Sequence, residues 1–152
     1  MITDRQVHRI DPASPRFRAV NHFLKHHRQT TAPRQAPLWC THHSSAGYTG
    51  AIWGQWMEHS LWLRSLFVSP PHRRQGLGQA LLCQVMQETS RFESSLTQLV
   101  AFVPTPYQGL YQSVGFHPAD ESKLPAPLQK RWQQAVDHAK PWHLYVYNLP
   151  TP

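Results

Sequence analysis

The sequence contains few cysteines and no long hydrophobic run. Only two of its 152 residues are cysteines, Cys40 and Cys83, which is too few for a disulfide framework and predicts buried free thiols. No stretch of 18 or more apolar residues is present, so a membrane-spanning helix is not expected. The opening MITDRQVHRID lacks the apolar core of a signal peptide, and a cytoplasmic protein is therefore expected.

Acidic residues are also scarce. Eight Asp and Glu stand against 15 Lys and Arg, which gives a net charge of +7 and favours anionic partners such as phosphates or acidic substrates. The basic residues form no long run, so nucleic acid is not favoured over a bound phosphorylated cofactor. With 40% apolar residues and neither a repeat nor a linker, the chain is expected to fold as one domain over 1–152.

Turn signals divide the chain into strand-like and helix-like stretches. Stretches rich in Trp, Tyr, Ile and Val predict an antiparallel meander over 38–42, 48–57 and 61–68. Further strands are expected over 2–10, 96–103 and 142–149. Helical spacing of apolar residues predicts helices over 14–28, 76–91, 105–115 and 127–139. The chain therefore mixes helices and strands along its whole length.

Residues 64–86, RSLFVSPPHRRQGLGQALLCQVM, place a glycine turn between a strand and a helix. The first amides of a helix have no intrahelical partners and carry partial positive charge, so they bind anions well. Gly76 and Gly78 let the backbone approach a phosphate closely, because neither has a Cβ. Arg73 and Arg74 add charge-assisted contacts. The stretch therefore predicts a phosphate site.

Two common phosphate-binding motifs are absent from this turn. A dinucleotide fingerprint needs G-x-G-x-x-G, but Leu81 stands at its third glycine and no acidic residue ends a following strand at the usual spacing. A P-loop needs G-x-x-x-x-G-K, which the turn also lacks. What remains is R-x-x-G-x-G after a strand that ends in V-x-P.

This pattern resembles the GNAT superfamily of acyl-CoA-dependent N-acetyltransferases. The matching residues are Leu66-Phe67-Val68, Pro70, Arg73, Gly76, Gly78 and Ala80-Leu81-Leu82. A second stretch, from Tyr111 to Gly115-Phe116, resembles the family's Y-x-x-x-G-F. The resemblance covers nearly all of the chain except 119–140, which has the character of an insertion. It implies a GNAT-like α/β (α+β) fold, with a central, mixed, mostly antiparallel sheet flanked by helices.

The resemblance also implies an activity and a cosubstrate. An acetyl group would pass from acetyl-CoA, without a metal, to a primary amine of a small molecule or peptide by direct attack in a ternary complex. The turn would hold the CoA pyrophosphate, and the end of the preceding strand would hydrogen-bond the pantetheine arm. The implied cofactor-binding residues are Leu66, Phe67, Val68, Arg73, Arg74, Gln75, Gly76, Leu77, Gly78 and Gln79. The N–H of Val68 or of its neighbours would polarise the acyl carbonyl.

Tyr111 stands where the family often has a tyrosine that protonates the departing thiolate. A phenol with a pKa of about 10 can donate a proton as the thioester collapses. The alternative is that Tyr111 only packs against the acyl-CoA. A different class of function is also open, namely a catalytically silent GNAT-like domain that binds acyl-CoA as a sensor or docks to an acidic partner.

At the position expected to contact the acceptor amine, this chain differs from one group of the family. The diamine and polyamine acetyltransferases resemble this chain around L-E-D-L-F-V, where the acids bind or deprotonate the amine, but here the acidic pair is Arg64-Ser65. Polyamines are therefore expected to be poor substrates, and an amine with a nearby carboxylate or phosphate fits better. Arg64 and Trp62 are the candidate acceptor-binding residues. Alternatively, Arg64 points away and pairs with a surface acid.

The sequence does not choose a general base. The candidates are Glu58, His59, His42 and His43, with a water chain as an alternative. Other pairs have structural explanations. His22 and His26 are expected on a solvated helix face rather than at a metal, and Cys40-x-His42 in packing. Four tryptophans on the meander are expected in the core or a cleft wall, or stacked on a substrate: Trp39, Trp53, Trp56 and Trp62. Because GNAT domains are frequently dimers, the resemblance leaves a homodimer open.

Overall fold

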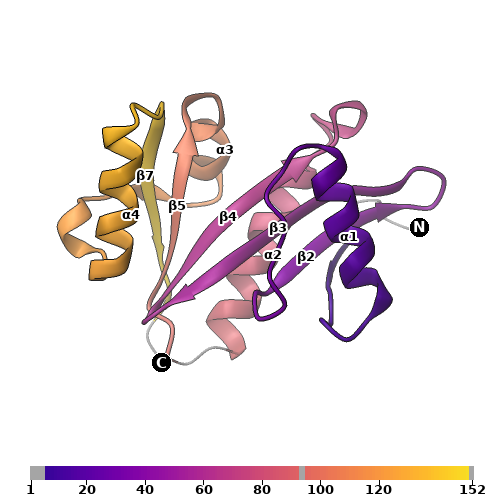
Figure 1. Ribbon diagram of the computed structural model, residues 1–152, viewed down its shortest axis with the longest axis horizontal. Coiled ribbons are helices and arrows are strands. Elements are labelled where there is room, and N and C mark those ends of the chain that lie inside the picture. The colour runs from indigo at the N-terminus through magenta and orange to yellow at the C-terminus, as the bar shows by residue number, and fades with distance from the viewer. Residues whose placement is uncertain (1–5, 93–94, 151–152) are drawn as a thin grey trace. The chain divides into compact units, whose positions relative to one another are not determined.

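The structure is a computed structural model that describes residues 6–92 and 95–150 (Figure 1). Its strands form a seven-stranded mixed sheet, hydrogen-bonded in the order β1-β2-β3-β4-β5-β7-β6. The β4–β5 pair is parallel, whereas the β1–β2, β2–β3, β5–β7 and β6–β7 pairs are antiparallel. This confirms the expected central, mixed, mostly antiparallel sheet of an α/β protein.

By its contacts the chain divides into two compact units. The first unit is Met1–Gln55 with Arg64–Val85, and the second is Trp56–Leu63 with Met86–Pro152. Strand β4 (Ser60–Val68) contributes residues to both units, as do β3 (Gly47–Met57) and helix α2 (Leu77–Phe92). The expectation that 1–152 is one domain stays a prediction.

In the first unit, helix α1 (Pro15–His26) covers one face of β2 (Leu38–His43) and β3 (Figure 1). The helix begins at Ser14, whose hydroxyl accepts a hydrogen bond from the N–H of Arg16 at 3.1 Å. The apolar stripe of the helix packs with both strands in one buried cluster. The cluster includes Phe17, Val20 and Leu24 of the helix and Leu38, Cys40, Ala51 and Trp53 of the strands. The helix predicted over 14–28 is confirmed.

The opposite face of β2 and β3 lies against helix α2. A Cβ built on Gly50 would lie 2.8 Å from Thr41 Oγ1 and 3.2 Å from Leu81 Cδ1 of that helix. Gly50 is therefore required where the strand approaches the helix closely. In the register Leu38 pairs with Trp53, and Trp39 with Ile52, so the two tryptophans occupy opposite faces. The expected tryptophan group is therefore divided, although Trp39, Trp53 and Trp62 are all buried.

In the second unit, β5 (Gln98–Pro104) lies between β4, which it joins over Ser60–Leu63, and β7 (Trp142–Asn148). Helix α4 (Ala126–Asp137) buries Leu128 against Val100, Leu144 and Val146 of β5 and β7. The segment 119–140 therefore supplies the cover for one face of these strands.

Three differences from the predicted elements have simple causes. The stretch 105–115 is split into a 3-10 turn, Thr105–Tyr107, and helix α3 (Gln108–Ser113). Strand β1 (Val7–Arg9) lies within the first expected strand, 2–10, of which residues 2–5 lie outside the described residues. The short strand β6 (His117–Pro118) was not predicted, because two residues are too few for a periodicity to appear. Cys83 is exposed on α2, so the expectation of two buried thiols is wrong for it and right for Cys40.

Candidate functional site

The glycine turn, residues 73–79, joins the end of β4 to the start of α2 in the first unit. A 3-10 turn, Pro70–His72, follows the strand, and α2 begins at Leu77. Arg74 and Gly76 both have left-handed backbones, with φ of 65° and 79°. Left-handed residues so close together are typical of turns whose successive N–H groups form an anion-binding concavity. The turn is exposed except at Leu77 and Gly78, as a site for a diphosphate requires.

Two predicted cofactor residues have definite contacts at this turn. Arg73 donates from Nε to the carbonyl of Val68 at 2.8 Å, and its guanidinium lies 5.5 Å from the Phe67 ring centroid. The structure therefore brings Arg73 to the strand end that is predicted to bind pantetheine. Leu77 is 2% exposed, so its side chain belongs to the core and only its backbone can face a ligand.

The end of β4 offers backbone N–H groups that could polarise the acyl carbonyl of acetyl-CoA, and one of them is already hydrogen-bonded. Leu66, Phe67 and Val68 are half-buried. The N–H of Ser69 donates to the carbonyl of Thr49 at 2.8 Å, so it is already used inside the sheet. Of Val68 and its following neighbour, Val68 is therefore the better candidate for the predicted N–H donor.

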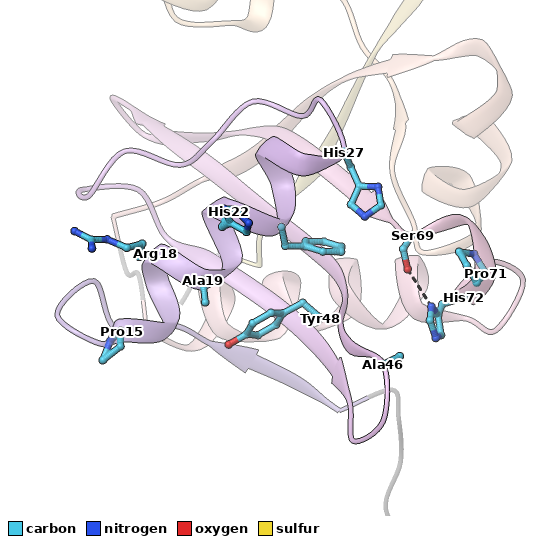
Figure 2. Close-up of a pocket in the computed structure, with 11 residues that line it drawn as sticks. Pro15, Arg18, Ala19, His22, His27, Ala46, Tyr48, Ser69, Pro71 and His72 are labelled. Atoms are coloured by element: carbon cyan, nitrogen blue, oxygen red, sulfur yellow. Dashed lines mark hydrogen bonds between the residues drawn. The ribbon is translucent and has the colours of Figure 1, made fainter.

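A pocket of about 750 Å³ lies beside this strand end in the first unit (Figure 2). Its apolar wall comes from α1 and from the hairpin of β2 and β3, and its polar groups come from α1 and the 3-10 turn. The described residues that line it are Pro15, Arg18, Ala19, His22, Phe23, His27, Ala46, Tyr48, Ser69, Pro71 and His72. None of these is acidic, whereas one is an arginine and three are histidines. The pocket is therefore suited to a ligand with an apolar body and a negative charge.

His27 is the titratable group of this pocket with a shifted pKa. It follows the last residue of α1, and its ring lies 4.8 Å from the Phe67 ring and 4.9 Å from the Phe23 ring, between centroids. Burial, with His26 and Arg73 nearby, lowers the pKa of His27 below its ordinary value of 6.5. At neutral pH its imidazole is therefore uncharged and can accept a proton.

The opposite wall of the pocket is held by two hydrogen bonds. His72 Nδ1 lies 3.0 Å from the Ser69 hydroxyl, as Figure 2 shows. The Tyr48 hydroxyl accepts from Arg16 Nε at 3.3 Å. These bonds fix the rings of His72 and Tyr48 in place and so define this part of the pocket wall.

Tyr111 belongs to the second unit, on α3. It is 6% exposed, and its ring makes an edge contact with Phe116 at 5.3 Å between centroids. Burial, with Tyr107 as a lesser cause, raises the pKa of Tyr111 above its ordinary value, so the phenol stays protonated through the neutral range. Across residues 6–92 and 95–150, its hydroxyl has no hydrogen-bond partner. The predicted roles of acid and of packing both stay predictions.

The two predicted acceptor residues are engaged with other side chains. Arg64 donates from Nη1 to Gln55 Oε1 at 3.2 Å, and its guanidinium lies 5.3 Å from the Trp53 ring centroid. Trp62, in the second unit, is 6% exposed, and the Arg131 guanidinium lies 6.0 Å from its ring. Their roles in reading an acceptor stay predictions.

The four predicted base candidates lie in turns and at strand ends, and all are exposed except His43, which is half-buried. Glu58 has a left-handed backbone with φ of 54°, and His59 Nδ1 lies 3.1 Å from the Ser95 carbonyl. His42 makes an edge contact with Tyr48, and His43 Nδ1 lies 2.9 Å from the Ser45 hydroxyl. Neither His42 nor His43 lines the first-unit pocket. His27 was not among the predicted base candidates. Its signal in the sequence is that it continues the Phe17, Val20 and Leu24 stripe at helical spacing.

The second unit has a smaller pocket of about 420 Å³, lined in part by the 119–140 segment. Tyr145 is fixed at its floor, since its hydroxyl donates to Gln108 Oε1 at 2.9 Å and accepts from Gln112 Nε2 at 2.7 Å. Trp132 and Trp142 contribute aromatic surface, and Asp120 and Glu121 contribute acidic groups. Asp120 is already committed, because its carboxylate accepts from the N–H of Ser122 at 3.0 Å.

None of the helices in residues 6–92 and 95–150 combines the length and the apolar character needed to cross a membrane. Within the same residues, no three histidines, cysteines or acids are grouped as metal ligands would be. The described His22 and His26 are both exposed, which agrees with a solvated helix face. The expected cytoplasmic location stays a prediction.

Comparison with known proteins identifies the architecture. The family profile described as "Acetyltransferase (GNAT) domain" matches residues 37–118, which span the meander, the glycine turn and the Tyr111 helix. A search of curated protein sequences found no significant match.

Solved structures of similar fold cover almost the whole chain. An N-acetylglutamate synthase from Neisseria gonorrhoeae, complexed with coenzyme A and N-acetyl-glutamate, has a TM-score of 0.68 at 18% identity over 95% of this chain. This chain covers only 35% of that synthase. A GNAT-family acetyltransferase from Staphylococcus aureus gives 0.66 at 14% identity, covering 95% of this chain and 100% of its own. The ribosomal-protein-S18-alanine N-acetyltransferase from Escherichia coli gives 0.61 at 16%, covering 95% and 92%. At these identities the likeness shows the fold alone.

Proposed function

Because the chain belongs to the GNAT acetyltransferase family, we propose that it transfers the acetyl group of acetyl-CoA to a primary amine by direct attack in a ternary complex. One observation carries the proposal: the exposed glycine turn, with left-handed Arg74 and Gly76, opens a 16-residue helix directly after a half-buried strand end. Helix amides and two arginines suit a diphosphate, and the strand end suits an amide-bearing arm. The residues present therefore fit acetyl-CoA.

The proposed chemistry uses one backbone group and one side chain. The N–H of Val68 would polarise the acyl carbonyl, and a neutral amine would attack its carbon. As the carbon–sulfur bond breaks, the protonated Tyr111 would supply a proton to the leaving thiolate. The buried phenol is a weaker acid than a free one, so its donation requires a thiolate that is forming at the same moment.

The fold relatives support an amine as the acceptor. One is named for N-acetylglutamate synthesis and another for acetylating an alanine of a ribosomal protein. An amino acid and a peptide amine are therefore both reasonable acceptors for this chain. An acetyl-CoA cosubstrate is in line with the coenzyme A present in the first relative.

The proposal is tested by release of free CoA thiol from acetyl-CoA against a panel of amines split by charge. Turnover with an anionic or neutral amine is expected, and polyamines are expected to react poorly if Arg64 reads the acceptor. Fast spermidine acetylation that Arg64→Ala leaves unchanged would remove Arg64 from the site. Tight binding of acetyl-CoA with no turnover on any amine would instead favour a catalytically silent domain.

A further inference from the structure

The first-unit pocket is long, and its two ends differ. Figure 2 shows Pro15 and Arg18 at one end and His27, Ser69 and His72 at the other. Arg18 and His27 are nine positions apart on and just after α1, which places their backbones about 13 Å apart at 1.5 Å per residue. A ligand that contacts both ends therefore has to be extended rather than a single amino acid.

The His27 end is the one adjacent to the predicted acetyl position. His27 packs on Phe67, and Ser69 lines the pocket, so the residues on both sides of Val68 meet this end. The Arg18 end is exposed and cationic. The middle of the pocket is apolar, with Ala19, Phe23 and Tyr48 along its length.

We propose that this pocket is the acceptor site, that it takes the free amino terminus of a peptide with apolar leading residues and an acidic fourth residue, and that His27 is the general base. This rests on the proposed acetyltransferase function. An extended peptide spans about 3.3–3.6 Å per residue, so the fourth residue lies about 10–11 Å from the first. With the amine at His27, the side chain of the fourth residue would cover the remaining distance to the Arg18 end. None of the described residues that line the pocket is acidic, and the net charge of +7 also favours an acidic partner.

The base and the acceptor amine are matched in strength. An α-amino group has an ordinary pKa of about 7.7–8.0, whereas a lysine side chain has one of about 10.4. The pKa of His27 is lowered below 6.5, so it lies nearer to that of an α-amine than to that of a lysine side chain. The contacts of its ring with Phe23 and Phe67 hold this base at the pocket end beside Val68.

The transfer balances with these groups. The imidazole of His27 takes one proton from the ammonium terminus, and the neutral nitrogen attacks the thioester carbonyl. The carbon–sulfur bond then breaks, and the leaving sulfur takes a proton from its donor, proposed above as Tyr111. The nitrogen loses its second proton, which restores the proton of that donor. The products are an N-acetyl peptide and free CoA. His27 returns its proton to water, so one proton is released per turnover.

The test uses the full chain, acetyl-CoA and tetrapeptide amides of sequence Ala-Leu-Phe-X with a free amino terminus. With X as Asp, kcat/KM is expected to exceed that with X as Lys at least tenfold. In Arg18→Gln this preference is expected to fall to within about twofold. Arg34→Gln removes one equally exposed charge outside the pocket and is expected to retain the preference.

His27 is tested by His27→Gln, with His26→Gln as the exposed neighbour control. His27→Gln is expected to lower kcat about a hundredfold, to leave acetyl-CoA affinity unchanged, and to abolish the rise of kcat with pH below about 6.5. The titratable and charged groups around His27 also affect this pH dependence of kcat. They are His26 from its own helix, Arg73 from the turn, and His22 and His72 around the pocket. Circular dichroism checks that each variant is folded.

The outcomes separate the two proposals. Equal rates for the Asp and Lys peptides, or a preference unchanged in Arg18→Gln, would overturn the acceptor assignment and leave the acetyltransferase in place. A His27→Gln enzyme with full kcat would remove the base. If acetyl-CoA binds but no peptide or small amine is acetylated, the proposed function fails; calorimetric binding of the Asp peptide that depends on Arg18 would then still support the peptide site.

Discussion

The two units of the chain differ in how their candidate functional groups are presented. In the first unit, the glycine turn and the pocket rim are exposed, cationic and shaped by backbone conformation. In the second unit, Tyr111 is a buried phenol, and its surroundings are set by side-chain packing with Phe116. The first unit is therefore built to hold anions, and the second to keep one proton in place. Substitutions that separate binding from chemistry test this division.

The largest effect is expected at the glycine turn. Gly78→Asp adds a negative charge in the first turn of α2, which favours the helix but repels a phosphate. Acetyl-CoA affinity is expected to fall more than a hundredfold while the melting temperature is unchanged or rises. Calorimetric titration and thermal melting measure the two effects. Gly109→Asp, on the exposed surface of α3, adds the same charge elsewhere and is expected to leave affinity intact.

A smaller effect on rate is expected from Tyr111→Phe. Removing the hydroxyl while keeping the ring is expected to lower kcat about 10- to 100-fold, because the leaving thiolate loses its proton donor. Acetyl-CoA affinity and thermal stability are expected to stay the same, since the edge contact with Phe116 persists. Stopped-flow turnover and calorimetry measure these quantities. An unchanged kcat would assign Tyr111 to packing alone.

Substitution of one glycine in each unit compares how the two units tolerate an added methyl group, measured as the free energy of unfolding. Gly50→Ala places a Cβ 2.8 Å from Thr41 Oγ1 and is expected to cost about 1–3 kcal/mol through overpacking. Gly109→Ala, in the second unit, has nothing within 4 Å and lies in a helix, so it is expected to be neutral or to stabilise by up to about 1 kcal/mol. Urea unfolding measures both. A Gly50→Ala protein as stable as the parent would mean that Thr41 and its other neighbours shift at little cost.

The smallest effect is expected from pH. The pKa values of His8 and His27 are lowered in the folded first unit, chiefly by burial, so the unfolded chain binds more protons near pH 6. Stability from these groups is therefore present above pH 6.5 and is lost as pH falls through that value. Hydrogen exchange of the first unit is expected to accelerate between about pH 7 and pH 5, and less so in a His8→Gln, His27→Gln double variant.

The second unit is expected to respond only at lower pH. Hydrogen bonds from Ser122 lower the pKa of Asp120 below its usual 3.8, so its contribution is present at neutral pH and is lost only as the carboxylate is protonated. Peptides from 119–140 are therefore expected to show flat exchange across the range in which the first unit changes. Parallel acceleration in both units would contradict the assignment to His8 and His27.

The elements that the sequence predicted well are those with long periodic patterns. The stripe of α1 and the apolar run of β5 determined their positions because burial on one face or on both leaves few alternatives. The glycine turn was also predictable, since glycines, arginines and a helix start occur consecutively in the chain. The prediction for Cys83 was wrong because this residue lies near the edge of the apolar stripe of α2. At such an edge, a small rotation of the helix about its axis decides whether a side chain is buried or exposed.

The pocket was not predictable in the same way. Arg18, Tyr48 and His72 come from three segments of the chain, and the cavity among them depends on how α1 lies across the hairpin. With 11 histidines in the sequence, residue type alone gives no reason to select His27. Its partial burial against Phe67, which separates it from the others, is a product of tertiary packing.

The pairing of β4 has a consequence for synthesis of the chain. Residues Ser60–Leu63 pair with Gln98–Ala101, so one edge of an apolar strand stays uncovered until about 40 more residues have been translated. Uncovered edges of this kind recruit other strands, and the parallel pairing forms only after the α2 crossover is made. A ribosome that pauses before β5 would therefore expose the Leu-Trp-Leu segment to chaperones or to other nascent chains. The rate of translation between residues 64 and 101 would then affect the yield of folded protein.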